Sequence, residues 1–96
     1  MFIVSLTYKV PIERVEEELA NHVSYLKEQY ALGTFHASGR KVPRTGGVIL
    51  SQLKDKEQQQ EALEKDPFYI HELADYSITE FIPTMTSKEL ECLLEG

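Results

Sequence analysis

Polar and apolar residues alternate along the first segment of the chain, Phe2 to Lys9. Four apolar side chains would share one face of an extended backbone: Phe2, Val4, Leu6 and Tyr8. The other face is mixed, because it carries Ile3 together with polar residues. A period of two residues predicts a β-strand with one buried face and one partly exposed face.

After Pro11 the spacing of apolar residues changes to three and four. The residues with this spacing are Ile12, Val15, Leu19, Val23, Leu26 and Tyr30. Each residue of an α-helix turns by about 100°, so these side chains form one stripe. The pattern predicts a helix from Pro11 to about Leu32 that ends at Gly33. His22 lies inside this stripe, where a leucine would fit the pattern.

The remaining patterns predict three more strands and three short helices. The strands are Thr34–Arg40, Gly47–Leu53 and Tyr76–Pro83, and the helices are Asp55–Lys65, Pro67–Leu73 and Lys88–Leu94. Within the second strand, alternation places Phe35 and Ala37 opposite Ser38 and Arg40. The third strand is largely apolar, which predicts burial on both faces. The order βαββαβ with a C-terminal helix predicts a ferredoxin-like α+β fold, in one domain spanning residues 1–96.

This fold leaves one face of the sheet uncovered, because both main helices pack on the other face. We expect apolar side chains such as Ile3, Ile49 and Phe81 on the uncovered face. A bare apolar patch of that size favours a sheet-to-sheet homodimer with two-fold symmetry. The last helix carries several leucines that need cover, and we expect it to reach over the partner.

Composition narrows the function classes. The chain has 96 residues, 16 of them acidic and 10 basic, for a net charge of -6. This balance, without a basic stripe, argues against a nucleic-acid partner. A membrane span needs about 18 consecutive apolar residues, and the chain has no such run. The sequence also lacks the pattern of a secretory signal peptide at its N-terminus.

Cysteine and histidine give no sign of a metal site or other cofactor. Cys92 is the only cysteine, so no intrachain disulfide can form. We expect Cys92 to pack as a small apolar side chain beside the neighbouring leucines, in a protein of the reducing cytoplasm. The three histidines, His22, His36 and His71, lack the spacing of metal ligands.

His22 and Asp66 are the first candidates for chemistry. An imidazole within an apolar stripe needs a hydrogen-bond partner, and the helix pattern alone favours a structural histidine bonded to a backbone carbonyl. Histidine is also the side chain best suited to proton transfer near neutral pH. Asp66 precedes Pro67, which is typical of a helix N-cap. The carboxylate can also accept a bond from His22, one oxygen serving each purpose, and we expect a separation of about 2.6–3.2 Å or one bridging water.

The end of the second strand and the loop after it form a second candidate site. Ser38 and Arg40 share a strand face, and Gly39 between them permits close approach to the backbone. The cations Arg40, Lys41 and Arg44 lie beside glycines, which predicts an anion-binding rim. An ordinary strand end followed by a solvated hairpin loop is the alternative interpretation.

Taken in order, several short motifs resemble the YCII-related (YciI-like) family. They are the opening strand MFIVSLTY, the helical His22, Ala37-Ser38-Gly39, Thr45-Gly46-Gly47-Val48-Ile49-Leu50 and Asp66-Pro67-Phe68. The resemblance spans about Met1 to Pro83. It implies a ferredoxin-like fold that dimerises as a dimeric α/β barrel, with an active site on His22 and Asp66 and a pocket lined by Ser38 and Gly39. Many relatives have proline where Arg40 stands, which implies a more cationic rim here.

The resemblance also implies chemistry on small molecules. One related branch eliminates chloride from chlorinated ring compounds, and the neighbouring muconolactone isomerase-like enzymes move protons on small cyclic acids. We therefore expect a cytoplasmic lyase or isomerase in which His22 is the general base, oriented by Asp66. Ser38 would hydrogen-bond the substrate, and Arg40 or Arg44 would hold a carboxylate or other anion. Two alternatives remain: a non-catalytic ligand-binding or stress-response dimer, and a structural dimer with an internal His–Asp bond.

Overall fold

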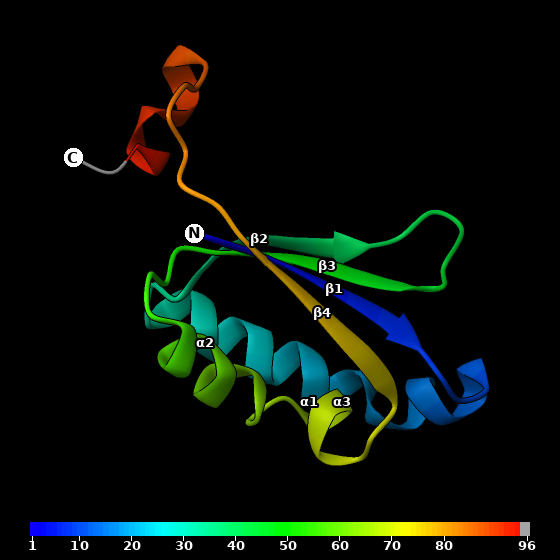
Figure 1. Cartoon of the computed structure of the whole chain (residues 1–96). Helices are drawn as coiled ribbons and strands as arrows, with labels where there is room; N and C mark the ends of the chain where they lie inside the picture. The colour runs from blue at the N-terminus through cyan, green and yellow to red at the C-terminus, as the bar shows by residue number, and fades with distance from the viewer. Residues whose placement is uncertain (95–96) are drawn as a thin grey trace.

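The computed structural model describes residues 1–94 and has the predicted α+β order; the last two residues of the predicted domain lie outside this range. The elements are β1 (Phe2–Tyr8), α1 (Ile12–Ala31), β2 (Phe35–Arg40), β3 (Gly46–Ser51), α2 (Lys56–Leu63), α3 (Pro67–Ile70), β4 (Ala74–Glu80) and the 3-10 helix η1 (Lys88–Leu93). The strand order is β2-β3-β1-β4, and every neighbouring pair is antiparallel. This is the ferredoxin-like arrangement. All three α-helices lie on one side of the sheet (Figure 1).

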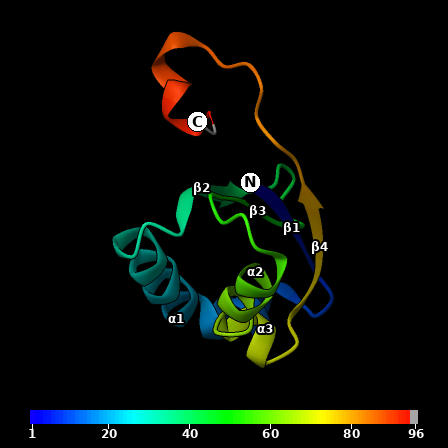
Figure 2. The ribbon, with the colours of Figure 1, turned by 60° about the vertical axis from the view of Figure 1, so that its left-hand side comes forward.

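The hydrophobic core lies between the sheet and the helices. In β1 the predicted alternation is confirmed, because Phe2, Val4 and Leu6 are buried while Ile3 and Thr7 are exposed. The helices contribute Val15, Tyr25, Leu63 and Phe68. α2 and α3 gather beneath β1 and β4, whereas α1 lies beneath the β2 side of the sheet (Figure 2). The two halves of the sheet are therefore covered by different helices.

The buried face of α1 differs from the face that its predicted apolar stripe marks. Its buried residues are Val15, Tyr25 and Gln29, while Leu19 and Val23 are exposed. α1 packs against both α3 and β2, and these two contacts turn a different face inward from the one that the apolar spacing marks. One edge of the apolar stripe therefore lies outside the core and faces a cavity described below.

Strand β2 contains a β-bulge at His36, which has no partner residue in β3. The prediction that Phe35 and Ala37 share one face is therefore wrong. Because the bulge adds one residue, Phe35 shares the helix-facing side with Ser38 and Arg40. Phe35 is 4% exposed and anchors β2 in the core. The bulge thus allows one strand both to anchor itself and to present two polar side chains toward α1.

Within residues 1–94, no α-helix covers the opposite face of the sheet. Val48 is 39% exposed on this face, so the prediction that β3 is buried on both faces is wrong for the single chain. Ile49, expected on the uncovered face, lies instead on the helix side and is 2% exposed. Ile3 and Phe81 are exposed, as expected. The sheet-to-sheet dimer stays a prediction.

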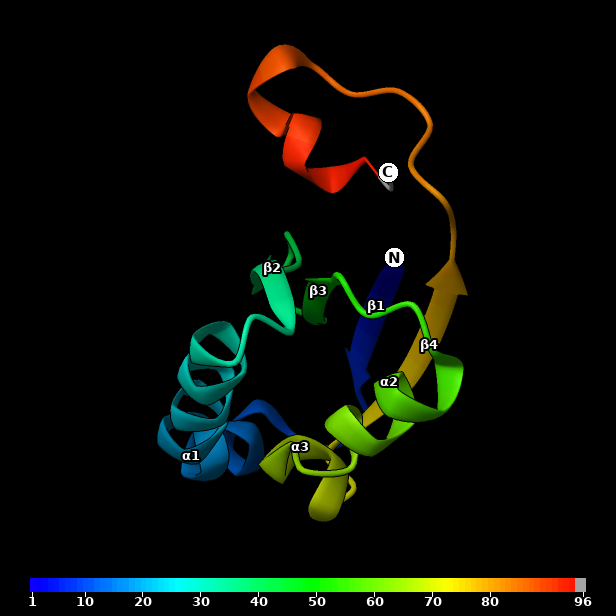
Figure 3. The ribbon, with the colours of Figure 1, turned by 90° about the vertical axis from the view of Figure 1, so that its left-hand side faces the viewer.

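After β4, residues 81–94 form a C-terminal arm that crosses to the uncovered side of the sheet (Figure 3). The arm ends in η1, so the short helix predicted over Lys88–Leu94 is a 3-10 helix over Lys88–Leu93, and its backbone is irregular at Leu90. Cys92 is exposed rather than packed among leucines, because η1 stands away from the core. Within residues 1–94, none of the helices combines the length and the apolar character of a membrane span.

Candidate active site

A hydrogen bond joins His22 of α1 to Asp66 at the start of α3. The distance from His22 Nδ1 to Asp66 Oδ1 is 2.7 Å, within the range expected from the sequence. The Asp66 side chain is fully buried, and the His22 side chain is 12% exposed. A carboxylate without water must be compensated by protein donors, and His22 supplies one of them from another helix.

The local sequence fixes Asp66 at this position. Asp66 is the N-cap of α3, and Pro67 follows in the first turn. The Phe68 N–H donates to Oδ1 of Asp66 over 3.0 Å. The N-cap prediction is confirmed, but the expected division of one oxygen for each purpose is wrong. Oδ1 accepts from both Phe68 and His22, which leaves Oδ2 for a different partner.

Tyr76 is the residue that sequence analysis missed. Its hydroxyl donates to Asp66 Oδ2 over 2.7 Å. Burial raises the pKa of Tyr76 far above its ordinary value, and the charge of Asp66 and this hydrogen bond raise it further. Tyr76 therefore remains a donor at neutral pH. Alternation in β4 places Tyr76 on the helix side, but nothing in the sequence shows that β4 brings it to α3.

Phe68 fixes the plane of the histidine ring. The rings of His22 and Phe68 stack with centroids 3.9 Å apart and an interplanar angle of 2°. Nδ1 is held by Asp66, so the ring is constrained both in its plane and about its axis. Within residues 1–94, Nε2 makes no hydrogen bond or ion pair, and His22 lines an open cavity.

The hydrogen-bond network assigns the tautomer of neutral His22. An ionised carboxylate can only accept hydrogen bonds, and Phe68 and Tyr76 both donate to it. With Asp66 ionised, the proton of neutral His22 lies on Nδ1 and faces the carboxylate. The other nitrogen, Nε2, then has a free lone pair, as a general base requires.

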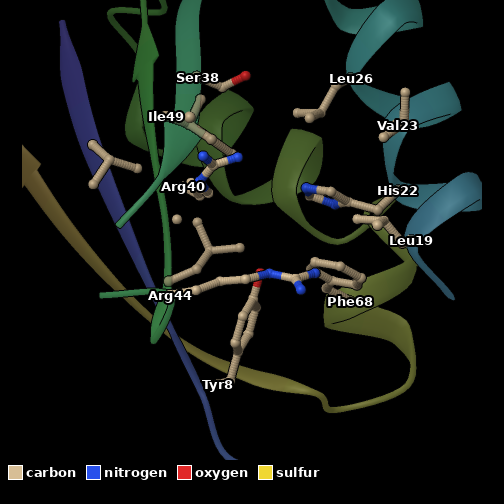
Figure 4. Close-up of a pocket in the computed structure, with 15 residues that line it drawn as sticks. Tyr8, Leu19, His22, Val23, Leu26, Ser38, Arg40, Arg44, Ile49 and Phe68 are labelled. Carbon is tan, nitrogen blue, oxygen red and sulfur yellow. The ribbon is translucent and has the colours of Figure 1, made fainter. Parts of the chain in front are cut away.

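The cavity beside His22 has a volume of about 300 Å³ and lies between α1 and the β2–β3 side of the sheet (Figure 4). Most of its walls are apolar, and they include Leu6, Leu19, Val23, Leu26, Ile49 and Phe68. Three of these residues belong to the α1 stripe, which explains why part of that stripe is exposed. Concave apolar sites with a few convergent polar groups are typical of small-molecule binding.

The two predicted arginines both reach this cavity. Arg40 comes from β2 and Arg44 from the loop after it, and both side chains extend into the cavity (Figure 4). Arg44 Nη1 lies 3.2 Å from Glu16 Oε1, so a carboxylate of α1 partly balances its charge. Within the described residues 1–94, the Arg40 side chain forms no ion pair or hydrogen bond. The cavity therefore carries one uncompensated guanidinium.

Ser38 and Gly39 also line the cavity. The Ser38 hydroxyl lies 2.5 Å from the Tyr30 hydroxyl of α1, so a ligand would meet a serine that already has a partner. A Cβ added to Gly39 would meet nothing within 4 Å, so packing within the chain does not require glycine there. Gly46 is different, because a Cβ at that position would lie 1.8 Å from the Leu6 carbonyl oxygen.

The other two histidines lie outside the cavity. His36 is at the bulge of β2, and His71 Nε2 lies 3.6 Å from Glu18 on the surface between α3 and α1. In the part of the chain that the structure describes, no three His, Cys, Asp or Glu side chains are grouped as metal ligands.

Comparison with known proteins agrees with this fold. Residues 1–82 match the sequence profile of the YCII-related domain. A solved structure of 5-chloro-2-hydroxyhydroquinone dehydrochlorinase from Burkholderia phenoliruptrix, in complex with 2,5-dihydroxybenzoquinone, is similar with a TM-score of 0.70 and 16% identity. That similarity covers 84% of this chain and 93% of the other, and it establishes a shared fold. No curated protein matches the chain. The profile extends from β1 through β4 and includes both His22 and Asp66, and the chain belongs to the YCII-related family.

Proposed function

We propose that this protein is a small-molecule lyase or isomerase that transfers a proton through Nε2 of His22. One observation carries the proposal: the unpartnered nitrogen of an Asp66-bound histidine borders a cavity in which Arg40, within residues 1–94, also lacks a partner. A base and a cation that line the same cavity suit a reaction that removes a proton and creates negative charge.

The proposed reaction begins on a carbon acid. Nε2 of His22 takes a proton from a carbon next to a carbonyl group, and the electron pair of the broken C–H bond moves onto the carbonyl oxygen as an enolate. Arg40 stabilises that oxyanion, and Asp66 stabilises the imidazolium that forms. Where a C=C bond is conjugated with the enolate, the electron pair moves to the far carbon of that bond, which takes the proton back from His22 and completes an isomerisation. Where the adjacent carbon carries a leaving group, the electron pair forms a C=C bond to that carbon. The leaving group departs with the electrons of its own bond, which completes an elimination.

The proposed substrate is a small anion that is cyclic or similarly compact. The cavity of about 300 Å³ is at the small end of ligand sites, and its apolar walls suit a ring. Arg40 favours a carboxylate or an ionised hydroxyl group. The similar dehydrochlorinase was solved with a small ring compound, 2,5-dihydroxybenzoquinone, which supports a ring-shaped ligand for this chain.

Two alternatives remain distinguishable from this proposal. A non-catalytic binding protein would hold the same anions but would leave their protons in place. A purely structural His–Asp pair would need neither an accessible Nε2 nor the unpaired Arg40. The open cavity beside His22 favours ligand chemistry over the structural role.

We also propose a homodimer in the cytoplasm, formed by the uncovered sheet faces. The dimer would remove the exposed side chains of Ile3 and Val48 from water. Each Å² of apolar surface buried in this way stabilises the dimer by about 25 cal/mol. Ala37 and Gly39 also lie on this face, and their small size leaves room for side chains of a second sheet. Cys92, as the lone cysteine, has no intrachain partner, and this fits a reducing compartment.

Proton–deuterium exchange against a panel of compounds tests the proposed function. Small carboxylates, lactones and hydroxylated or halogenated ring compounds are incubated with the protein in deuterated water, and NMR follows the loss of C–H signals. We expect exchange on at least one compound with the wild type and with the control His36→Gln, and none with His22→Gln. Binding without exchange would favour the non-catalytic alternative, and neither binding nor exchange would contradict the proposal.

A further inference from the structure

We infer that Tyr76 is a positioning residue of this site: its hydroxyl keeps Asp66 an ionised acceptor and thereby keeps the proton of neutral His22 on Nδ1. The catalytic meaning of this inference rests on the proposed function. The position of the histidine proton is a property of the protein alone, so it can be measured without a substrate.

The inference begins with the burial of Asp66. Its side chain is fully buried, so protein donors must replace the water that a carboxylate normally binds. Oδ1 accepts from the Phe68 N–H at 3.0 Å and from His22 at 2.7 Å. Within residues 1–94, Oδ2 accepts only from Tyr76, at 2.7 Å. The Tyr76 hydroxyl is therefore the one donor, among these residues, to one of the two oxygens of a buried carboxylate.

Loss of this donor would change what Asp66 presents to His22. A buried carboxylate with a bare oxygen is stabilised by taking up a proton, because burial disfavours the charged form. A carboxylic acid can donate a hydrogen bond, whereas a carboxylate can only accept. A donor opposite Nδ1 places the imidazole proton on Nε2. His22 would then present an N–H to the cavity instead of a lone pair, and it could no longer act as a base.

Two contacts besides Asp66 hold Tyr76 in place. Tyr76 lies in the middle of β4, opposite Leu6 of β1. Its ring meets the Tyr69 ring edge-on, with centroids 5.4 Å apart and an interplanar angle of 67°. Strand pairing and ring packing thus place the donor in advance. Preorganised donors of this kind orient catalytic groups in enzymes.

Tyr69 offers a matched control. Its hydroxyl accepts a hydrogen bond from Gln60 at 3.0 Å and makes none to Asp66. Tyr69→Phe and Tyr76→Phe remove the same atom from neighbouring, packed tyrosines. Only the second substitution removes a donor from the carboxylate.

The test is a long-range ¹H–¹⁵N correlation spectrum of the histidine rings at neutral pH, which distinguishes the two tautomers. We expect protonated Nδ1 for neutral His22 in the wild type and in Tyr69→Phe. In Tyr76→Phe we expect a population with protonated Nε2. We also expect proton–deuterium exchange on the ligand to be slower in Tyr76→Phe by about ten- to hundredfold, which is the effect expected for the loss of one hydrogen bond to a charged group.

An unchanged tautomer in folded Tyr76→Phe, or an equal change in Tyr69→Phe, would overturn the inference. The wild type provides a second measurement that needs no variant. At neutral pH, the ¹³C shift of the Asp66 carboxyl should be that of an ionised group, and a protonated value would overturn the inference too. The tautomer could change in Tyr76→Phe while the wild type exchanges no C–H proton on any compound of the panel. That result would support the role of Tyr76 and count against the proposed function.

Discussion

Replacement of Asp66 should cost far more stability than replacement of an exposed aspartate. In Asp66→Ala, the donors of Phe68 and Tyr76 lose their acceptor in or near the core. Each donor left unsatisfied away from water costs about 1–3 kcal/mol, so the two together cost about 2–6 kcal/mol. This is a large part of the 5–15 kcal/mol, roughly, that stabilises a domain of ordinary size.

Asp66→Asn separates the loss of charge from the loss of shape. The amide keeps an oxygen that can accept from Phe68, and its nitrogen can donate to the Tyr76 hydroxyl. We expect a smaller cost, about 1–2 kcal/mol, because the network is rearranged rather than emptied. Asp75→Ala is the control, since Asp75 is exposed and its side chain, among residues 1–94, forms only a surface ion pair with Lys9 at 3.3 Å. Such pairs contribute about 0–1 kcal/mol.

Urea denaturation followed by circular dichroism measures these differences at one fixed protein concentration. The dependence of the unfolding free energy on urea is about 1–3 kcal/mol per molar for a small domain. A loss of about 3 kcal/mol therefore lowers the midpoint by at least about 1 M. If Asp66→Ala unfolded at the same urea concentration as Asp75→Ala, the described network would not be an important part of the fold.

Four further predictions test other features. Gln59 is fully buried, and neither polar atom of its side-chain amide has a partner among residues 1–94. Gln59→Met should therefore raise the unfolding free energy by about 1–3 kcal/mol, and a lower unfolding free energy would contradict this prediction. Burial raises the pKa of Tyr25 and Tyr76 above the ordinary value of 10.0, so the folded state holds these protons more tightly than the unfolded state. The urea midpoint should therefore fall as the pH rises above 10.0, and a midpoint independent of pH in that range would count against the burial of these hydroxyls. Small carboxylates should raise the melting temperature of wild type and of Arg14→Ala but not of Arg40→Ala, and equal shifts in all three would reject the assigned anion site. Light scattering after size exclusion should give twice 11.0 kDa, and a folded monomer would refute the dimer.

Features of the structure that depend on neighbouring residues were predicted well. The alternation of β1 needs only the period of apolar side chains, and the N-cap at Asp66 needs only the residues that follow it. Asp55 accepts from the Glu57 N–H at 2.8 Å, and Asp66 accepts from the Phe68 N–H. These are local hydrogen bonds, so their signal lies within a few residues of sequence.

Features that depend on packing between distant segments were predicted poorly. The bulge at His36 changes the faces of β2, and no residue type marks it. The rotation of α1 follows from its contacts with α3 and β2, which periodicity alone does not contain. Tyr76 reaches Asp66 only because β4 runs beside β1 and above α3, so its role requires the tertiary structure. The contact between His22 and Asp66 is also non-local, and it was anticipated because the family resemblance placed both residues in one site.

We propose that the cavity beside His22 is a site of proton transfer on a small anion. The most direct test is a crystal structure with a compound that exchanges its C–H protons in the presence of the protein. We expect the exchanging carbon within about 3–3.5 Å of His22 Nε2, with the anionic group of the compound on Arg40. A compound bound elsewhere, or bound in the cavity with its exchanging carbon turned away from His22, would rule out this role for His22.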